Sequence, residues 1–395
     1  VVKIIIVLLM NKKYKMIKIL TIIGARPQII KSAALSRCID KKFSNKIEEI
    51  LVHTGQHYDD NMSKIFFDEL NINKNIEFLN IKPTNQNEMI GDMIKKIEKS
   101  IRKNNPDMVL VYGDTNSTLA GSIAASNLKI PLIHIEAGLR SYNYNMPEEL
   151  NRIYCDYASS MLFCPTENAV KNLKKEGFMH SDKQPYNPNQ KGIFLCGDIM
   201  LDNAIFYGSI AEKKSKILEK FNLKEENYVL LTLHRNYNTS NLSGLETILK
   251  SLSEIVTKFD LKLFFPIHPH TQKIINANKA LKNVLTKNKN IIVSQPISFF
   301  DMIMIEKKSK VICTDSGGVQ KEAFFFAKPC IILRDETEWT ELTQHTFAKL
   351  AGNSYEKIID SFNYFYNNKS NYSLPLFGNG NSAEFICEKI ISNFE

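Results

Sequence analysis

The chain has 395 residues, of which 44% are hydrophobic and 24% are charged, an ordinary composition for a globular protein with a large core. This length allows roughly two or three domains. The formal net charge is +9, but Lys and Arg are scattered and form no stripe interleaved with aromatic residues, so we expect no nucleic-acid partner. A mild positive charge suits an anionic nucleotide ligand instead.

Cysteine usage and the first residues bear on the compartment. The seven cysteines are odd in number and none forms a C-x-x-C pair, which favours buried, reduced thiols in a cytoplasmic protein over disulfides or zinc ligands. The apolar run 1–10 is too short to span a membrane and lacks a small-residue cleavage site, so we expect no membrane partner and no signal peptide. Because Met16 opens a natural first strand, we expect residues 1–15 to be a non-native or disordered extension.

Short apolar runs alternate with longer amphipathic stretches along the whole chain. Near-continuous apolar runs are typical of strands buried on both faces of a parallel sheet. Strand and helix in alternation predict an α/β fold with right-handed crossovers. The predicted strands are 17–23, 50–53, 108–112, 131–135, 161–164, 193–196, 228–233, 261–267, 291–294, 310–313 and 330–333.

A polar segment containing Pro and Asn, 180–192, interrupts this rhythm and is interpreted as a linker between domains. The sequence therefore predicts two doubly wound, Rossmann-like domains, one over 16–180 and one over 193–378. A last helix over 379–395 is expected to pack back on the first domain.

Reactive and Gly-rich residues follow the ends of six predicted strands. In open parallel sheets, ligands bind beyond the carboxyl ends of the strands. Both predicted domains contribute, so we expect the site in a cleft between them. The residues at these tips are Arg26, Asp114, Glu136, His234, His268 and the run Ser316-Gly317-Gly318.

The segment 315–322 is the best candidate for a phosphate site. A strand ends there, a tight Gly turn follows, and the free N–H groups at the start of the next helix would point at a diphosphate. Glu322 lies one helical turn after Gly318, where its carboxylate could accept hydrogen bonds from ribose hydroxyls. A plain N-cap by Ser316 with a solvated Glu322 explains the pattern equally well.

Other candidate motifs are weaker by themselves. The run that contains Arg26 is no G-x-G-x-x-G fingerprint, although an arginine fork there suits phosphate oxygens. Glu148 and Arg152 have the spacing of an ion pair on a helix surface, and spacing alone favours that interpretation. No H-E-x-x-H or C-x-x-C motif is present, and a metal-free site is expected. Spacing identifies no partner for His57, His180 or His345.

Taken together and in this order, the motifs resemble those of the non-hydrolysing UDP-N-acetylglucosamine 2-epimerase family from about Met16 to the C-terminus. The resemblance implies a GT-B-like fold with UDP bound by the second domain, a homodimer, and no metal, nicotinamide or other cofactor. The motifs are Gly24-Ala25-Arg26-Pro27-Gln28 with Lys31, His53-Thr54-Gly55-Gln56-His57, Gly113-Asp114-Thr115, His134-Ile135-Glu136-Ala137-Gly138-Leu139-Arg140, Pro147-Glu148-Glu149 with Asn151-Arg152, His234-Arg235, and Thr314-Asp315-Ser316-Gly317-Gly318 with Glu322.

The resemblance also implies a reaction, in which UDP is eliminated across C1 and C2 of a UDP-2-acetamido sugar and adds back after C2 is reprotonated on the opposite face. Asp114, Glu136 and Glu148 match the acidic catalytic positions of the family, and they are assigned jointly. His234 matches the catalytic histidine and is expected to contact the diphosphate or to assist departure of UDP. The expected substrate-binding residues are Arg26, Lys31, Arg140, Arg152, Arg235, Ser316, Gly317, Gly318 and Glu322.

The segment 334–341 departs from the Thr-Glu-Arg-Pro-Glu motif of many family members. Trp339 replaces the usual arginine and Thr340 replaces the proline. This departure, together with Ala25, Gln28 and the segment 321–326, resembles the subgroup that acts on UDP-2,3-diacetamido-2,3-dideoxy-glucuronate for surface-polysaccharide synthesis. The C6 carboxylate of that sugar would need a cation, and the candidates are Arg140 and Arg235. Gln56 and His268 are candidate contacts for a second, activating UDP-sugar.

Three rival functions remain open at this point. A UDP-sugar-dependent GT-B glycosyltransferase would share the fold and the nucleotide site, but it would leave the three carboxylates unexplained. A hydrolysing 2-epimerase would release free sugar and UDP. A non-enzymatic nucleotide-binding protein would have no use for acidic residues at the strand tips.

Overall fold

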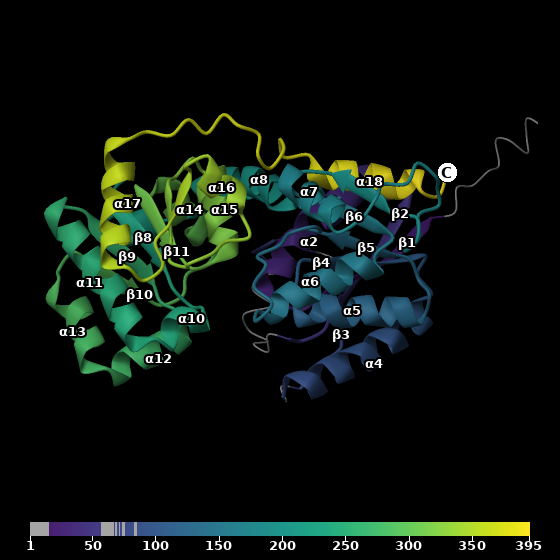
Figure 1. The fold of residues 1–395 in the computed structure, drawn as a ribbon, viewed down its shortest axis with the longest axis horizontal. Coiled ribbons are helices and arrows are strands. Elements are labelled where there is room, and N and C mark those ends of the chain that lie inside the picture. The colour runs from purple at the N-terminus through teal and green to yellow at the C-terminus, as the bar shows by residue number, and fades with distance from the viewer. Residues whose placement is uncertain (1–15, 57–66, 68, 71, 73–75, 83–84) are drawn as a thin grey trace, which may run out of the picture. The chain divides into compact units, whose positions relative to one another are not determined.

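The computed structural model describes residues 16–395 except for 57–66, 68, 71, 73–75 and 83–84, and the chain forms two compact α/β units (Figure 1). The first unit runs as far as Asp202 and also contains Phe377–Glu395, and the second is Asn203–Leu376. Each unit has its own parallel sheet. None of the helices in the described part of the chain is long and apolar enough to cross a membrane.

The first unit is built on a seven-stranded sheet in the order β3-β2-β1-β4-β5-β6-β7, in which every neighbouring pair is parallel. The central strands are buried on both faces, which explains their unbroken apolar sequences. The strands are β1 (Ile17–Ile23), β2 (Ile47–His53), β3 (Ile76–Phe78), β4 (Met108–Tyr112), β5 (Leu132–Ile135), β6 (Met161–Cys164) and β7 (Gly192–Leu195).

Three helices of the first unit begin where a short polar side chain accepts from a free backbone N–H group. Thr115 caps the first turn of α5, and Thr166 does the same for α7. The last helix, α18, packs against α2. Helix α8 carries the chain from the first unit into the second. The helices are α2 (Arg26–Cys38), continued by the short η1 (Ile39–Phe43), α4 (Gln86–Asn104), α5 (Asn116–Asn127), α6 (Pro147–Ala158), α7 (Glu167–Lys175), α8 (Ile199–Lys214) and α18 (Ser382–Ser392).

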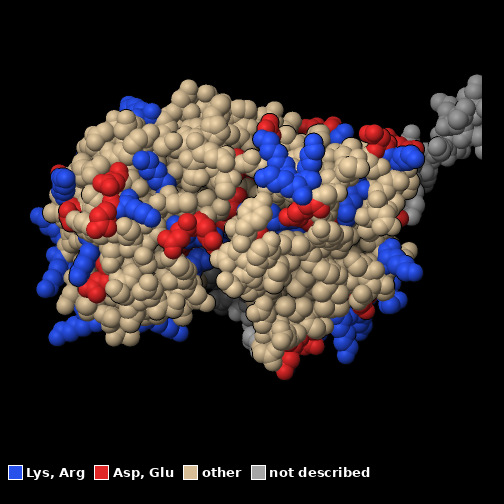
Figure 2. Space-filling model, in the orientation of Figure 1, with Lys and Arg blue, Asp and Glu red and all other residues tan. Residues whose placement is uncertain are grey.

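Helices α5 and α6 form an uncharged surface on the first unit, which Figure 2 shows as a tan area. Helix α5 contains no Lys, Arg, Asp or Glu. On α6, Leu150, Tyr154 and Tyr157 are 53%, 39% and 55% exposed and follow each other at helical spacing. Large exposed apolar side chains gathered on one surface mark an interaction site more often than isolated ones do.

The second unit has a six-stranded parallel sheet in the order β10-β9-β8-β11-β12-β13. Its strands are β8 (Tyr228–Thr232), β9 (Lys262–Pro266), β10 (Ile291–Ser294), β11 (Val311–Thr314), β12 (Cys330–Ile332) and β13 (Ala348–Leu350). Its helices are α9 (Ile217–Lys220), α10 (Asn236–Thr239), α11 (Leu242–Lys258), α12 (Pro269–Ala277), α13 (Lys279–Lys287), α14 (Phe299–Lys308), α15 (Gly317–Phe325), α16 (Thr340–Gln344) and α17 (Tyr355–Asn367).

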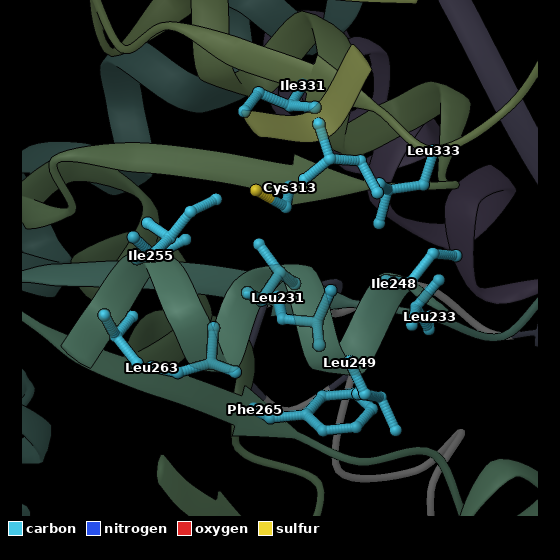
Figure 3. Packing of buried hydrophobic residues seen from close by; sticks show 14 of the residues in the cluster. Leu231, Leu233, Ile248, Leu249, Ile255, Leu263, Phe265, Cys313, Ile331 and Leu333 are labelled. Carbon is cyan, nitrogen blue, oxygen red and sulfur yellow. The ribbon is translucent and has the colours of Figure 1, made fainter. Parts of the chain in front are cut away.

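The core of the second unit lies between its sheet and helix α11 (Figure 3). Leu231 on β8 and Leu249 on α11 are both 0% exposed. Burying a leucine side chain contributes roughly 1.5–3 kcal/mol, so this layer fixes the strands whose ends carry the candidate site. The labelled members of the cluster are Leu231, Leu233, Ile248, Leu249, Ile255, Leu263, Phe265, Cys313, Ile331 and Leu333.

Two parallel sheets confirm the predicted α/β class, but one predicted linker is wrong. The segment 180–192 lies inside the first unit, because the strand that follows it, β7, pairs in parallel with β6. The predicted strand 193–196 therefore belongs to the first sheet. The chain enters the second unit between Asp202 and Asn203, within α8.

Both sheets reverse their strand order at one point, between β1 and β4 in the first unit and between β8 and β11 in the second. From β1 the chain builds outward through β2 and β3, and from β4 it builds in the other direction. Open α/β sheets bind ligands at the carboxyl edge beside such a reversal.

Candidate functional site

The loop after β1 is held by Gln28, whose side chain is 1% exposed. Its carboxamide oxygen accepts hydrogen bonds from the N–H groups of Gly24 (2.9 Å) and Ala25 (3.1 Å). Its amide nitrogen donates to the carbonyl of Tyr112 (2.9 Å), the last residue of β4. Arg26 begins α2 from this loop and is half-buried.

At the tip of β4, three consecutive backbone carbonyls are each bound by a side chain. The carbonyl of Tyr112 accepts from Gln28 and from Thr118 Oγ1 (2.6 Å). The carbonyl of Gly113 is 2.8 Å from His134 Nε2. The carbonyl of Asp114 accepts from Asn151 Nδ2 (2.9 Å). The peptide that presents Asp114 is thus fixed from three sides.

Glu136 follows β5 and has a positive φ of 72°, an uncommon conformation for a residue with a side chain. Its carboxylate pairs with the ammonium of Lys31, and the two side chains are 11% and 12% exposed. A Cβ added at Gly113 would come within 3.0 Å of Glu136 Oε2 and 3.3 Å of Lys31 Nζ. Glycine is therefore required at the tip of β4, because the ion pair lies directly against it.

Helix α6 supplies acids and a cation at its N-terminus. Glu148 is half-buried in the first turn, and Glu149 is 0% exposed. Glu149 accepts from the backbone N–H groups of Ser141 and Tyr142, and these bonds together with Arg152 lower the pKa of Glu149 although burial opposes this. Arg152 donates to Glu149 with Nη1 and to Asp114 with Nη2.

Arg140 lies in a buried network of the first unit and is 3% exposed. Its guanidinium donates to both carboxylate oxygens of Glu176 at 2.7 Å, to Asp156 Oδ2 at 2.8 Å and to the carbonyl of Leu139 at 2.7 Å. Burial alone would lower the pKa of Arg140, but its two carboxylate partners raise it. These partners leave little of the guanidinium for a ligand.

Gln56 follows β2 and contacts the start of α5. Its carboxamide oxygen accepts from the N–H (3.0 Å) and hydroxyl (2.7 Å) of Ser117, which leaves its amide N–H groups to other partners. His57, the last residue of the same motif, lies outside the described residues.

In the second unit, His234 follows β8 and pairs with Asp315, which follows β11. Their Nδ1 and Oδ1 atoms are 3.2 Å apart, and the His234 side chain is 43% exposed whereas Asp315 is buried. Asp315 also accepts from the backbone N–H of Arg235 (3.0 Å) and from Asn238 Nδ2 (3.1 Å). Burial would raise the pKa of Asp315, but the hydrogen bonds and the histidine lower it. An ionised Asp315 orients the imidazole so that Nε2 points away from the carboxylate.

The turn after β11 leads into α15 through Ser316, Gly317 and Gly318. Ser316 is the N-cap residue, but its side chain makes no capping hydrogen bond. A Cβ at Gly317 would lie 2.3 Å from Glu338 Oε1, whereas a Cβ at Gly318 would meet only Ser316 Oγ, at 3.9 Å. Gly318 is exposed, so the backbone at the start of α15 is accessible to an anion there.

Two cations lie beside this turn. Arg334 Nη1 is 3.0 Å from Glu338 Oε2, and both side chains are more than nine-tenths buried. Lys321 is 1% exposed, and its Nζ is 4.2 Å from the ring centre of Trp339, which is 2% exposed. A cation held over an indole face is stabilised by the electrons of the ring. Glu322, next to Lys321, is half-buried on α15.

Two further predicted residues lie at strand tips of the second unit. Arg235 is half-buried and begins α10 as its N-cap residue. His268 begins α12, and its Nδ1 accepts from the N–H of His270 at 3.3 Å. The rings of His268 and His234 are 6.4 Å apart. Among the residues that the structure describes, no group of three or more His, Cys, Asp or Glu side chains is placed to hold a metal ion.

The structure therefore brings several predicted residues to the carboxyl edge of the first sheet, namely Arg26, Lys31, Asp114, Glu136 and Arg152. It brings His234, Arg235 and the Ser316 turn to the carboxyl edge of the second sheet. Sequence reasoning assigned no role to the residues that hold the strand tips, although all but Asp156 lie in the quoted motifs. Their roles depend on hydrogen bonds between distant segments, for which the sequence gives no local signal. They are Gln28, His134, Asn151, Asp156 and Glu149.

Comparison with known proteins gives a consistent result. The family model described as UDP-N-acetylglucosamine 2-epimerase matches residues 41–391. A UDP-N-acetylglucosamine 2-epimerase homolog of Methanococcus maripaludis is 43% identical over 94% of this chain and 98% of its own length. The UDP-2,3-diacetamido-2,3-dideoxy-D-glucuronate 2-epimerase of Pseudomonas aeruginosa is 42% identical, again over 94% of this chain and 98% of its own length.

The fold is also that of a solved relative. The crystal structure of the UDP-GlcNAc 2-epimerase of Methanocaldococcus jannaschii, in complex with UDP-GlcNAc and UDP, superposes with a TM-score of 0.84 at 40% identity. The match covers 96% of this chain and all of that one. The predicted GT-B-like fold is thereby confirmed.

Proposed function

Because this chain belongs to the UDP-N-acetylglucosamine 2-epimerase family, we propose that it inverts C2 of its substrate with Asp114, Glu136 and Glu148 as the acid–base groups. The chain is an isomerase that epimerises UDP-acetamido sugars without net hydrolysis. We propose the roles of the individual residues, the exact sugar and the assembly.

One observation carries the assignment of the acids. Carboxylates follow two adjacent strands of the first sheet, and two of them are paired with cations from other elements, Glu136 with Lys31 and Asp114 with Arg152. The pairing holds each carboxylate in one place at its strand tip, where it can take part in proton transfer. In the second unit, the acid at the tip of β11, Asp315, is buried and paired with His234.

The chemistry requires such a set. A proton on C2 of an acetamido sugar is only weakly acidic, so the bond between C1 and the UDP oxygen must break early, with positive charge developing at C1. Carboxylates stabilise that charge, and one of them removes the C2 proton. A second group must return a proton to the opposite face of C2 before UDP adds back. We assign Asp114, Glu136 and Glu148 to these tasks jointly.

We further propose that the second unit holds the UDP of the same sugar. The N–H groups of Gly317 and Gly318 at the start of α15 suit a diphosphate, with the Ser316 hydroxyl and Arg26 as additional donors. The N–H of Ser316 itself donates to Thr314 Oγ1 at 2.9 Å. Glu322 would accept from the ribose. His234, oriented by Asp315, has Nε2 available for the oxygen that leaves with UDP. Water must be excluded during the glycal stage, because otherwise UDP and the glycal would separate.

The substituents at C3 and C6 of the sugar need a separate argument. The two relatives described above are named for different sugars and are almost equally identical to this chain. We propose the 2,3-diacetamido glucuronate, on the strength of Trp339 and its neighbours. Its C6 carboxylate needs a cation, and we favour Arg235, which lies half-buried at the tip of β8. Arg140, the other candidate, already donates to Glu176 and Asp156.

The test uses purified protein in D2O with each sugar in turn and without any acceptor. We expect deuterium at C2 of intact UDP-sugar, followed by NMR, and faster exchange with the diacetamido uronate. Absence of deuterium with both sugars would overturn the proposed reaction. Free UDP that accumulates at the rate of turnover would indicate a hydrolysing enzyme. Transfer that starts only when an acceptor sugar is added would indicate a glycosyltransferase.

A homodimer remains a prediction, and we propose the uncharged surface of α5 and α6 as its interface. A chain with a net charge of +9 repels its own copy, and an uncharged surface is where two copies meet at least cost. Replacing Tyr154 by Glu on α6 should convert the dimer into a monomer in analytical ultracentrifugation. Tyr364, which is 37% exposed on α17 of the second unit, provides the matched control Tyr364→Glu. A Tyr154→Glu variant that stays dimeric would exclude this surface.

Two further predictions concern regulation and location. Gln56 and His268 are proposed contacts for a second UDP-sugar, and a sigmoid dependence of rate on substrate that becomes hyperbolic in Gln56→Ala would support them. A rate that is hyperbolic in the wild type would exclude such activation. A cytoplasmic location remains a prediction from the seven free cysteines.

A further inference from the structure

His134, the third residue of β5, is 0% exposed and has a hydrogen-bond partner at each ring nitrogen. Nδ1 lies 2.8 Å from Asp156 Oδ1, and Nε2 lies 2.8 Å from the carbonyl oxygen of Gly113. Asp156 is also 0% exposed and comes from α6. The ring therefore links the helix that carries Glu148 to the strand tip that carries Asp114.

The two partners determine how many protons the ring carries. A backbone carbonyl can only accept a hydrogen bond, so Nε2 must bear a proton. Asp156 would need to be a neutral acid for Nδ1 to be the acceptor. Burial favours that neutral acid, but Arg140 donates to Asp156 Oδ2 at 2.8 Å, the backbone N–H of Gly138 donates to the same oxygen at 3.1 Å, and the pKa of Asp156 lies below its usual range. With Asp156 ionised, Nδ1 also bears a proton, and the ring is an imidazolium.

Three further charged groups lie around this pair. Asp156 is also paired with Arg140 (2.8 Å), and Arg140 is paired with Glu176 (2.7 Å). The ammonium of Lys191 donates to the backbone carbonyl of Asp156 at 3.3 Å. Arg140 and Lys191 can together balance Asp156 and Glu176, so the case for a charged ring rests on the hydrogen bonds at Nδ1 and Nε2.

The carbonyl held by His134 belongs to the peptide that leads directly into Asp114. Gly113 has a positive φ of 63°, so this peptide turns away from the direction of β4. Asp156 also accepts from the N–H of Gly138 at 3.1 Å, beyond Glu136 at the tip of the neighbouring strand. The buried pair of His134 and Asp156 thus holds the backbone just before Asp114 and just after Glu136.

We propose that His134 is a positioning residue, held as a buried imidazolium by Asp156, which sets the orientation of the Gly113–Asp114 peptide for proton transfer at C2. His134 itself does not act on the sugar. This inference rests on the proposed role of Asp114, but the protonation of the ring is a separate claim that activity measurements do not decide.

The first test is NMR of the whole protein labelled with 15N histidine. We expect His134 to show two ring N–H protons at pH 7.5, where an exposed imidazole carries one for most of the time. His180 is the internal control, because it is exposed and its Nδ1 accepts from the N–H of Ile193 at 2.9 Å. A single N–H on His134 at this pH would overturn the proposal, whatever the activity of the enzyme.

The second test separates positioning from a general loss of structure. In His134→Gln the amide nitrogen can donate, but the amide oxygen can only accept and is repelled by the Asp156 carboxylate, so the side chain no longer links Asp156 to the Gly113 carbonyl. We expect kcat to fall about 10²-fold, because small displacements of a catalytic group have effects of this size. The Kd for UDP should change less than about threefold. His180→Gln is the matched control and should leave both unchanged. An unchanged kcat in His134→Gln, or equal losses in kcat and UDP affinity, would contradict positioning.

Asp156→Asn provides an independent variant in case His134→Gln does not fold. The neutral amide of Asn can donate to an unprotonated Nδ1 and no longer holds the ring charged, so the second N–H proton should disappear and kcat should fall as in His134→Gln. Combining both changes should cost no more than one alone, because they act on one unit. Fully additive losses would show that the two residues act separately. If Asp114→Asn keeps full exchange at C2, the proposed role of Asp114 is wrong. Two ring N–H protons on His134 would still support a charged ring in that case.

Discussion

Arg152 on α6 pairs through Nη2 with the carboxylate of Asp114, although 38 residues separate the two in the sequence. The same guanidinium donates through Nη1 to Glu149, whose side chain is fully buried. A spacing argument suggests a surface pair between Arg152 and Glu148, but the Arg152 side chain is only 4% exposed. Arg152 therefore joins the strand tip to the helix that begins beside it.

Replacing Arg152 by Met should impair both stability and catalysis. It leaves the carboxylate of Glu149 buried without its cation, which costs about 3–5 kcal/mol when one partner of a buried pair is removed. Urea unfolding measures this loss. Lys171→Met is the control, since Lys171 is exposed and pairs only with Glu167 one turn away. Equal stability of the two variants would contradict the buried pairing.

The acids themselves should be separable from substrate binding. Asp114→Asn and Glu136→Gln keep size but remove charge, so we expect C2 exchange in D2O to fall by about 10²-fold or more. UDP affinity, measured by calorimetry, should change little because the proposed UDP contacts lie mainly in the second unit. Glu48→Gln, at an exposed position on β2, serves as the control. Exchange at the wild-type rate in either acid variant would remove that acid from the mechanism.

The stability of the second unit should depend on pH through Asp315. The pKa of Asp315 is lowered in the folded protein, so its ionised form stabilises the fold at neutral pH. That contribution is complete above the ordinary Asp pKa of about 4 and is lost as the pH falls through the lower folded value. The free-energy difference between wild type and Asp315→Asn, from urea unfolding, should therefore shrink from pH 7 to pH 3. Asp360→Asn, at an exposed position, should show no such change. A difference that stays constant with pH would contradict an ionised Asp315.

The two glycines of the phosphate turn should respond differently to alanine. At Gly317 the new methyl group would lie 2.3 Å from Glu338 Oε1, which Arg334 holds in place. Such crowding costs about 1–3 kcal/mol. At Gly318 the nearest atom is 3.9 Å away, and we expect no loss of stability. Thermal unfolding of both variants compares them directly, and a Gly317→Ala variant as stable as Gly318→Ala would show that Glu338 moves freely.

Most of the fold could be predicted from the sequence, because buried parallel strands have unbroken apolar runs. The two strands that escaped prediction, β3 and β13, are three-residue edge strands that include half-buried and exposed positions. Their pairing depends on neighbours rather than on their own sequence. The segment 180–192 was misassigned for the related reason that a polar run inside a unit has the same composition as a linker.

The candidate site was predictable in part. Residues at strand tips, such as Asp114, Glu136 and His234, are recognisable because topology gathers the ends of parallel strands. The side chains that hold those tips are not recognisable in this way. Gln28, 84 residues from the Tyr112 carbonyl that it binds, is an ordinary helix residue until the sheet is assembled. Arg140 shows the converse, since an arginine in a family motif proves to be engaged by Glu176 and Asp156.

The most direct test of elimination and re-addition follows two isotopes in one reaction. UDP-sugar with 18O in the bridge between C1 and the β-phosphate is incubated in D2O with the enzyme and analysed by 31P NMR and mass spectrometry. We predict that epimerised sugar carries deuterium at C2 and that 18O moves from the bridge into non-bridging positions of the β-phosphate, with no accumulation of free UDP. Deuterium at C2 with all 18O still in the bridge would show that the C1–O bond never breaks, and would contradict the mechanism.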